Sequence, residues 1–580
     1  MEDRSESPPA IGTEEYNTLP YTEKRIYVKH KGTLSTGLAH TAALLGFFAL
    51  ISRLLGLVRD LCMAWLLGGG AVADALVGAM RLPHVLRRLL GEGSLSMTLT
   101  ASLVHLARQT HGNNGPDMRA LADALNIRLG AILCGLTILG MLAAPWLATL
   151  LAPGFDAPQN TMTVTLLRIC LPYIPAAAMA ALSMAFLHSI NVFWLPAFSP
   201  VLFNCVILSF AGLGALNILS PAWALATGMT FGGIVQWLTQ WLAVRRLLPH
   251  TAKRYPEKDA TNKHIFTVRY AWDCLRSIPA GMLGAAAPQI AMLLAMAMAS
   301  SLGQGHMAAL YYAERFLELP LGFIGVCLGM ASLPVLSRLA AQGAMEQFME
   351  QLATALRLTL LCILPAIAGL WVVGPRLVEG MFYHGAFDDI ATHATGEALL
   401  AYLPGLPALA VNRPLLAACN ALSTTRQTAA STIASAIITL ATGLALLKCL
   451  PEKLTIMAPA LAVNTGMWVQ TGILLFTVHN ALHARGIPPN THWLPHITQV
   501  LRQAMAAVAA GLSAWLMLIL VQNLWTSIGL AIVGGITTWA LMLLVLHDTD
   551  FYALIVSVRP QRKKSAMTDT RSHGKTDGPA

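Results

Sequence analysis

The feature that most constrains this chain is a series of apolar stretches, each long enough to cross a lipid bilayer as a helix. About 20 apolar residues in a helix span the hydrocarbon core, and a helix satisfies its own backbone polar groups there. We count fourteen such stretches in the 580 residues. They cover residues 38–67, 71–107, 122–152, 163–189, 195–216, 221–244, 273–301, 305–337, 350–374, 392–421, 427–447, 457–480, 499–522 and 526–547. The predicted fold class is an all-α polytopic membrane protein with 14 transmembrane helices.

The composition agrees with a membrane protein and gives no sign of metal or cofactor binding. Hydrophobic residues make up 56% of the chain and charged residues only 11%, against about 25% charged in soluble domains. The nine cysteines lie in or at the ends of apolar stretches, without the spacing of a zinc or disulfide framework. We therefore expect no metal, no cofactor and no nucleic-acid partner.

Lysine and arginine predict the orientation. With fourteen spans both termini lie on one side, where we count 24 of the 38 Lys and Arg residues, whereas the opposite loops carry three. Arg502, at the edge of stretch 499–522, is counted with the loop before it. Basic loops remain cytoplasmic, so both termini are expected in the cytoplasm. The other eleven basic residues lie within the stretches, and all of them are arginine.

An internal repeat divides the chain. Residues 154–156 (Gly-Phe-Asp) and 386–388 (Ala-Phe-Asp) are 232 apart, and at the same offset Pro172 and Pro404 each break the next stretch. Two six-helix lobes plus two C-terminal helices follow, an arrangement typical of transporters with a site between repeats. The predicted parts are a disordered tail (1–37), an N-lobe of spans 1–6 (38–247), a cytoplasmic linker (248–271), a C-lobe of spans 7–12 (272–484), the last two helices (485–558) and a second disordered tail (559–580).

Residues 52–92 carry an unusual set of charges in otherwise apolar sequence. A charge in hydrocarbon costs several kcal/mol and by default indicates function. The short Gly68–Gly70 turn suggests that the two spans pack together and that their charges converge. A second cluster, 311–318, contains Arg315 near the start of the other lobe. The charged residues of the first cluster are Arg53, Arg59, Asp60, Asp74, Arg81, Arg87, Arg88 and Glu92.

The charged residues of the first cluster could have structural roles instead of binding a ligand. Arg53 could pair with Asp74 and Arg59 with Asp60, the charges could lie at the membrane interface, or they could brace the hairpin. Five basic residues against three acidic ones nevertheless leave positive charge, and the planar guanidinium fork suits phosphate. The residues thus favour transport of an anionic or phosphate-bearing molecule. A membrane-embedded polyprenyl-phosphate transferase is disfavoured, because it needs a general base or metal-binding carboxylates and the acidic groups here are few and dispersed.

Several stretches resemble the lipid II flippase family (MurJ, also MviN), within the superfamily of multidrug and oligosaccharide-lipid exporters. They are residues 52–60, 74–75, 82–88 and 92–93, and then 311–315 running to Pro320 and Gly322. His84 stands where the family usually has asparagine, and Arg81 where lysine is common. Over the remaining spans the resemblance lies in the fourteen-span topology rather than in individual residues.

The resemblance implies a monomeric, multi-pass, alternating-access transporter of the bacterial inner membrane, not an enzyme. It would flip lipid II, an undecaprenyl-diphosphate-linked muropeptide, from the cytoplasmic to the periplasmic leaflet for peptidoglycan synthesis. The last two helices would form a groove for the lipid tail among membrane lipids. Export of another polyprenyl-diphosphate-linked oligosaccharide is the alternative, and a coupling cation is left open. The implied substrate-binding residues are Arg53, Arg59, Arg87, Arg315 and Asp74, with Ser52, Asp60, His84 and Glu92 beside them.

Overall fold

The computed structural model describes residues 21–89, 118–248, 286–324, 330–488 and 493–552, and every regular element in these ranges is a helix. The chain forms two compact units. Unit 1 comprises Met1–Tyr311 with Phe382–Ala391, and unit 2 comprises Tyr312–Met381 with Thr392–Ala580. The expected linker 248–271, apart from Leu248, and the expected tail 559–580 lie outside the described residues. The predicted lobe boundaries therefore stay a prediction.

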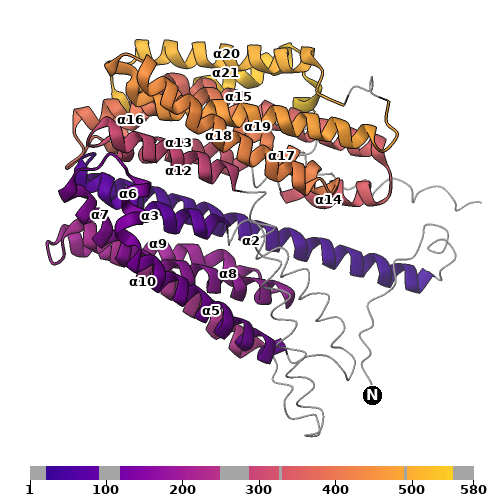
Figure 1. Ribbon diagram of the computed structural model, residues 1–580. Helices are drawn as coiled ribbons and strands as arrows, with labels where there is room; N and C mark the ends of the chain where they lie inside the picture. Colours follow the sequence, from indigo (N-terminus) through magenta and orange to yellow (C-terminus); the bar gives the residue numbers. More distant parts are fainter. Residues whose placement is uncertain (1–20, 90–117, 249–285, 325–329, 489–492, 553–580) are drawn as a thin grey trace, which may run out of the picture. The chain divides into compact units, whose positions relative to one another are not determined.

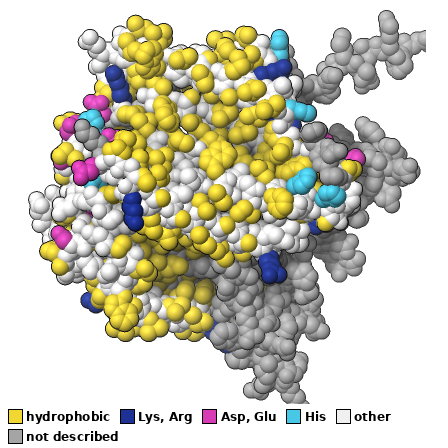
Figure 2. All heavy atoms as spheres, turned by 45° about the horizontal axis from the view of Figure 1, so that its top comes forward, with side chains coloured by type: hydrophobic (Ala, Val, Ile, Leu, Met, Phe, Trp, Pro, Cys, Tyr) yellow, Lys and Arg dark blue, Asp and Glu magenta, His cyan; other side chains and the backbone are white. Residues whose placement is uncertain are grey.

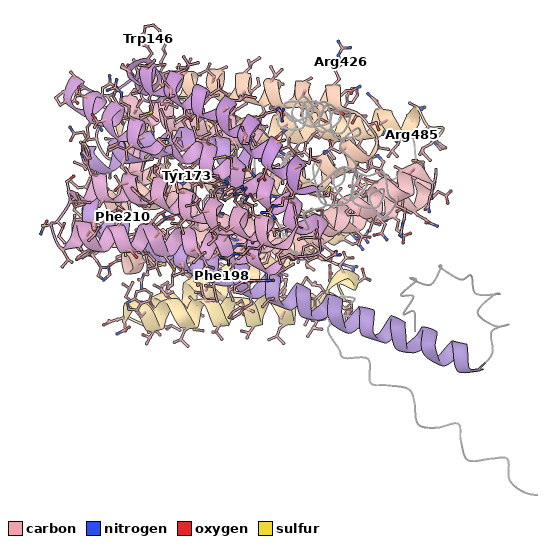
Figure 3. All side chains as sticks on the ribbon, turned by 90° about the horizontal axis from the view of Figure 1, so that it is seen from below. Trp146, Tyr173, Phe198, Phe210, Arg426 and Arg485 are labelled. Carbon is pink, nitrogen blue, oxygen red and sulfur yellow. The ribbon has the colours of Figure 1, made fainter. Side chains whose placement is uncertain are left out.

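Unit 1 is built from helices of the first half of the chain and the loop between α15 and α16 (Figure 1). Its helices are α2 (Tyr21–Leu67), α3 (Ala71–Arg88), α5 (Met118–Leu142), α6 (Ala144–Leu151), α7 (Ala157–Cys170), α8 (Tyr173–Ser189), α9 (Trp194–Ala215), α10 (Pro221–Leu247), α12 (Ala287–Ala299), a short turn at Ser300–Leu302 and the start of α13 (His306–Ile324). Tyr173 lies fully buried inside this unit, whereas Trp146 points outward (Figure 3).

Unit 2 contains the rest of α13 and the later helices. They are α14 (Met330–Ala341), α15 (Met345–Phe382), α16 (Asp389–Tyr402), α17 (Leu406–Ala421), α18 (Thr425–Cys449), α19 (Ala458–His483), α20 (Ile497–Leu520) and α21 (Leu524–Val545). The face that α20 and α21 present is largely hydrophobic (Figure 2), with exposed side chains such as Leu512, Trp515 and Ile536. Large exposed apolar surface indicates contact with lipid or another apolar partner.

The predicted all-helical membrane fold is confirmed. Each of the fourteen expected stretches contains at least one helix, and within the described ranges nine helical segments are long and apolar enough to cross a membrane. Both predicted proline breaks are present. The fourth stretch divides into α7 and α8 at Leu171–Pro172, and the tenth divides into α16 and α17 at the turn Leu403–Gly405. Proline removes a backbone donor and ends the helical ladder at these places.

Two expectations need correction. Helix α2 begins at Tyr21, so residues 21–37 are helical rather than disordered. Extending an existing helix avoids the unfavourable nucleation step, which explains why polar residues continue it. The first two spans also do not pack along each other, because α2 packs mainly against α9 and α3 against α7. The glycine turn thus joins helices with different neighbours.

Close packing between α18 and α19 depends on a missing side chain. A Cβ added to Gly466 would overlap the Thr439 hydroxyl and approach the Ser435 carbonyl oxygen to 2.8 Å. Both hydroxyl residues are fully buried. Small residues let membrane helices approach closely, which replaces the hydrophobic driving force absent in lipid.

We expect Gly466→Ala to destabilise unit 2 by about 1–3 kcal/mol, because overpacking forces neighbours apart. Gly472→Ala is the matched control on the same helix, since a Cβ there meets nothing within 4 Å. That control should be neutral or slightly stabilising, as alanine favours helix over glycine. Thermal unfolding of both purified variants in detergent measures the difference, and equal stabilities would contradict the packing argument.

Candidate functional site

A buried ion pair forms the centre of the candidate site. Arg59 and Asp60 lie on α2, and Arg59 donates through Nε (3.0 Å) and Nη2 (2.9 Å) to Asp60 Oδ1. The two side chains are 12% and 3% exposed. This is the pairing that the sequence offered as one alternative. Pairing offsets the desolvation of both charges.

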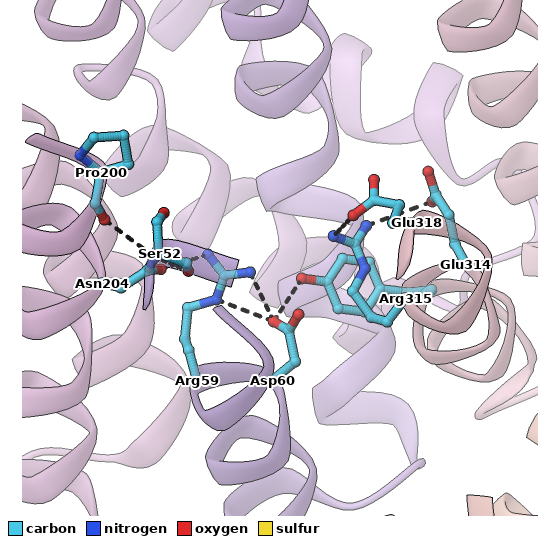
Figure 4. A network of polar contacts seen from close by, with 9 residues as sticks. Ser52, Arg59, Asp60, Pro200, Asn204, Glu314, Arg315 and Glu318 are labelled. Atoms are coloured by element: carbon cyan, nitrogen blue, oxygen red, sulfur yellow. Dashed lines mark hydrogen bonds and ion pairs between the residues drawn. The ribbon is translucent and has the colours of Figure 1, made fainter. Parts of the chain in front are cut away.

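Asn204 of α9 fixes the other side of the guanidinium (Figure 4). Its Oδ1 accepts from Arg59 Nη1 at 3.3 Å. Its Nδ2 donates to the carbonyl oxygens of Ser52 and Pro200, both at 3.1 Å. These donor bonds orient the amide so that its oxygen faces Arg59. Ser52 therefore contributes through its backbone.

Tyr311 completes the network from α13. Its hydroxyl donates to Asp60 Oδ1 at 3.1 Å, and its side chain is 2% exposed. One hydrogen-bond network thus links the three helices α2, α9 and α13. Among the described residues Arg59 donates three of its five N–H groups to protein acceptors, which leaves two.

The second arginine cluster lies further along α13, within unit 2. Arg315 follows Tyr311 by one helical turn and shares its face. Its Nη1 donates to Glu318 Oε2 at 2.9 Å, and its Nη2 lies 3.7 Å from Glu314 Oε2. Arg315 is 16% exposed and Glu314 is 4% exposed at the side chain. Both site arginines are thus held by carboxylates of their own helix.

Asp74 has a different role in the structure from the one that its charge suggested. It is fully buried, and its carboxylate accepts from the backbone N–H groups of Gly305 (2.5 Å) and Ala308 (2.7 Å). A carboxylate at this place caps α13 and faces the positive end of the helix dipole. Measured along α3, Asp74 lies about 6 Å from the Gly68–Gly70 turn. Measured along α2, Arg59 lies about 13 Å from the same turn.

The remaining predicted residues lie further along α2 and α3 from the glycine turn. Arg53 is exposed on α2, and His84 and Arg87 are partly exposed on α3. Glu92 lies outside the described residues. The structure therefore brings Ser52, Arg59 and Asp60 together in unit 1 and places Asp74 elsewhere. Whether these residues bind substrate stays a prediction.

Two residues of the network were not among the predicted site residues. Tyr311 belongs to the second charged cluster of the sequence, 311–318, and Asn204 lies in the apolar stretch 195–216. Asn204 could have been found as a buried amide in the apolar stretch 195–216, since polar residues inside spans often hold helices together. Within the described residues no group of three or more His, Cys, Asp or Glu side chains is placed to hold a metal ion.

Comparison with known proteins gives consistent matches. The family described as lipid II flippase MurJ matches residues 63–558, which begin just after Arg59. Lipid II flippase MurJ of Burkholderia cenocepacia is 28% identical over 479 residues, covering 81% of this chain and 88% of the relative. The probable lipid II flippase MurJ of Rhizobium meliloti is 29% identical over 507 residues, covering 86% and 90%. That of Vibrio cholerae is 31% identical over 383 residues, covering 64% and 71%.

Two solved structures share the fold of this chain. A lipid II flippase MurJ in an inward closed conformation superposes with a TM-score of 0.69 at 22% identity, covering 88% of this chain and all of the other. An inward-facing multidrug resistance transporter of the MATE family and MOP superfamily gives a TM-score of 0.60 at 13% identity, covering 77% and 98%. At these identities the likeness concerns the fold.

We expect Asp74→Ala to loosen the start of α13, because two amides lose their acceptor, at about 1–3 kcal/mol. Hydrogen exchange of residues 303–312 should accelerate. Asp123→Ala is the control: Asp123 is 32% exposed beside Arg245 at 3.5 Å, and such pairs contribute about 0–1 kcal/mol. Unchanged protection of the Gly305 and Ala308 amides in Asp74→Ala would refute the cap.

Proposed function

This chain belongs to the lipid II flippase (MurJ) family, and from that premise we propose that it carries lipid II across the bacterial inner membrane. It is a transporter rather than an enzyme, and it is a multi-pass membrane protein. We further propose that transport runs from the cytoplasmic to the outer leaflet, with both termini cytoplasmic. The 24-to-3 division of loop and tail Lys and Arg supports this orientation.

The observation that supports the proposal most is the Arg59 guanidinium, which is held in a fixed orientation while only part of its N–H groups are hydrogen-bonded. Asp60 and Asn204 hold it in one rotamer before any ligand arrives, so little conformational entropy is lost on binding. Its two remaining N–H groups can donate to phosphate oxygens, and guanidinium–phosphate contacts are strong and directional. A diphosphate is the anionic group of lipid II that suits this donor.

The other predicted residues are proposed as further ligand-binding groups, each considered within its own unit. Arg315 offers a second guanidinium, held in place by Glu318 and Glu314. Arg53 of α2 and Arg87 and His84 of α3 are proposed to meet the ligand as well, and the proposed role of Glu92 stays a prediction from sequence. The polyprenyl tail would lie against the apolar face of α20 and α21, whose exposed leucine and tryptophan side chains suit a hydrocarbon chain.

For Asp74 we propose a role in closing the transporter rather than direct contact with the diphosphate. Alternating access needs contacts that hold one face shut and then break. The two hydrogen bonds that the backbone N–H groups of Gly305 and Ala308 donate to Asp74 join α3 to the start of α13. They are charge-assisted, so they hold firmly, yet a carboxylate released to water is readily solvated.

We expect Arg59→Ala to lower lipid II exposure at the outer leaflet at least about tenfold, because a hydrogen bond to a charged group contributes about 1.5–3 kcal/mol. Arg59→Lys should recover only part, since charge remains but the planar fork is lost. Arg128→Ala is the control, because Arg128 Nη1 donates to Ala124 O of its own helix. Cells lacking any other flippase provide the assay.

The outcomes separate the hypotheses. Full lipid II exposure after depletion of the protein would refute the proposed substrate and favour another polyprenyl-diphosphate-linked oligosaccharide. Full exposure with Arg59→Ala, when depletion abolishes it, would refute only the role of Arg59. Membrane insertion of each variant is checked by the amount recovered in the membrane fraction.

Asn204→Ala tests whether orientation of the guanidinium matters. We expect a severalfold loss of lipid II exposure, since losing one neutral hydrogen bond costs about 0.5–1.5 kcal/mol. Asn126→Ala removes another buried amide of unit 1, one that accepts from Trp237 at 3.4 Å and does not contact Arg59. Equal losses in both variants would indicate a general packing defect instead.

A further inference from the structure

The loop between α15 and α16 packs within unit 1, although the helices on both sides of it belong largely to unit 2. We call residues Phe382–Ala391 the strap. The Ala386 N–H donates to the Trp65 carbonyl oxygen at 3.0 Å, at the end of α2. Phe387 is 2% exposed, and its ring centroid lies 5.6 Å from that of Phe382. The strap is therefore seated on the turn between α2 and α3.

Glycine residues in the strap and in the α2–α3 turn allow the two backbones to approach closely. Gly68 and Gly385 have φ of +67° and +66°, which side chains rarely adopt. A Cβ on Gly68 would overlap the Ala386 carbonyl, and one on Gly385 would overlap Trp65. A Cβ on Gly69 would overlap that of Ala391. The backbones can therefore meet only because these side chains are absent.

A second contact in unit 1 is related to the first by the sequence repeat. The Gly154 N–H donates to Ser300 Oγ at 3.0 Å, and a Cβ on Gly154 would overlap the backbone of Ser300 and Ser301. Positions 154 and 386 differ by 232, and so do positions 68 and 300. Each repeat therefore rests its Phe-Asp loop on the first hairpin of the other repeat.

The aspartates of the repeat make both loops rigid. Asp156 Oδ1 accepts from the Gln159 N–H, and Asp388 Oδ1 accepts from the Ala391 N–H, both at 2.9 Å. Each aspartate caps the helix that follows its loop. Gln159 then donates to the Ala71 carbonyl oxygen at 3.2 Å, at the start of α3. The shared spacing of the two copies thus encodes two loops that are each fixed by an aspartate cap.

We propose that the strap and the loop around Gly154 form a two-part clasp that closes the outer face, and that the strap leaves the α2–α3 turn when this face opens. This inference rests on the proposed alternating-access function. The hydrogen bonds from the Ala386 N–H to the Trp65 carbonyl oxygen and from the Gly154 N–H to Ser300 Oγ both have their donors in loops, so both can break without unfolding a helix. Bistable contacts of this size are what domain-closure transitions use.

The test adds one methyl group. Gly69→Ala places a Cβ against Ala391, whereas Gly70→Ala, one residue on, meets nothing within 4 Å. The double variant Gly69→Ala/Ala391→Gly restores the space. Spin labels at Ile390 on the strap and Leu150 on α6, which are 78% and 74% exposed, report the distance in purified protein whose native cysteines are replaced.

We expect Gly69→Ala to raise the ratio of long-distance to short-distance molecules at least about fivefold. Gly70→Ala and the double variant should match the unmodified chain. A distribution that does not change in Gly69→Ala overturns the clasp. If Gly69→Ala fails to insert, Gly154→Ala wedges the other half, and an unchanged distribution there overturns it as well. No lipid II is present, so this result is independent of the flippase assay.

Discussion

The charge of Arg59 inside an apolar helix is the constraint on which the centre of unit 1 depends. An unpaired guanidinium in hydrocarbon would cost several kcal/mol, so the fold must supply acceptors. Asp60 supplies them from the same helix, and Asn204 and Tyr311 supply further links from α9 and α13. The same bonds that make the charge tolerable tie three helices together. The packing of α2, α9 and α13 therefore depends on the same network that we propose for phosphate binding.

The parts that the sequence predicts well are those set by local physics. Hydrophobic length identified the spans, and proline placed the breaks at residues 172 and 404, because both effects act within a few residues. Packing partners could not be predicted this way. That α2 lies against α9 depends on the complete set of side chains on both helices, and Asn204 acquires its meaning only when it faces Arg59.

Asp74 shows why a charge alone does not reveal its purpose. A buried carboxylate needs donors, and the sequence offered the arginines of the same cluster. The structure satisfies it with the free N–H groups at the start of α13 instead, which every helix presents. Such donors leave no trace in sequence, because any residue carries them. The Gly68–Gly70 turn is similar: its three glycines suggested a tight hairpin, whereas Gly68 and Gly69 are also needed for the approach of a distant loop.

The central network and the clasp lie on the same helices. Helix α2 carries Arg59 and ends at the turn that receives the strap, and α13 carries Tyr311 and starts where Asp74 binds. In the proposed function a diphosphate binds the two remaining N–H groups of Arg59, while Asp60 and Asn204 keep their hydrogen bonds to it. A displacement of Arg59 would then reach α13 through Asp60 and Tyr311. Because helices are rigid over this length, a change at their middle is transmitted to their ends without a separate relay. Substrate binding would thereby act directly on the contacts that keep the outer face closed.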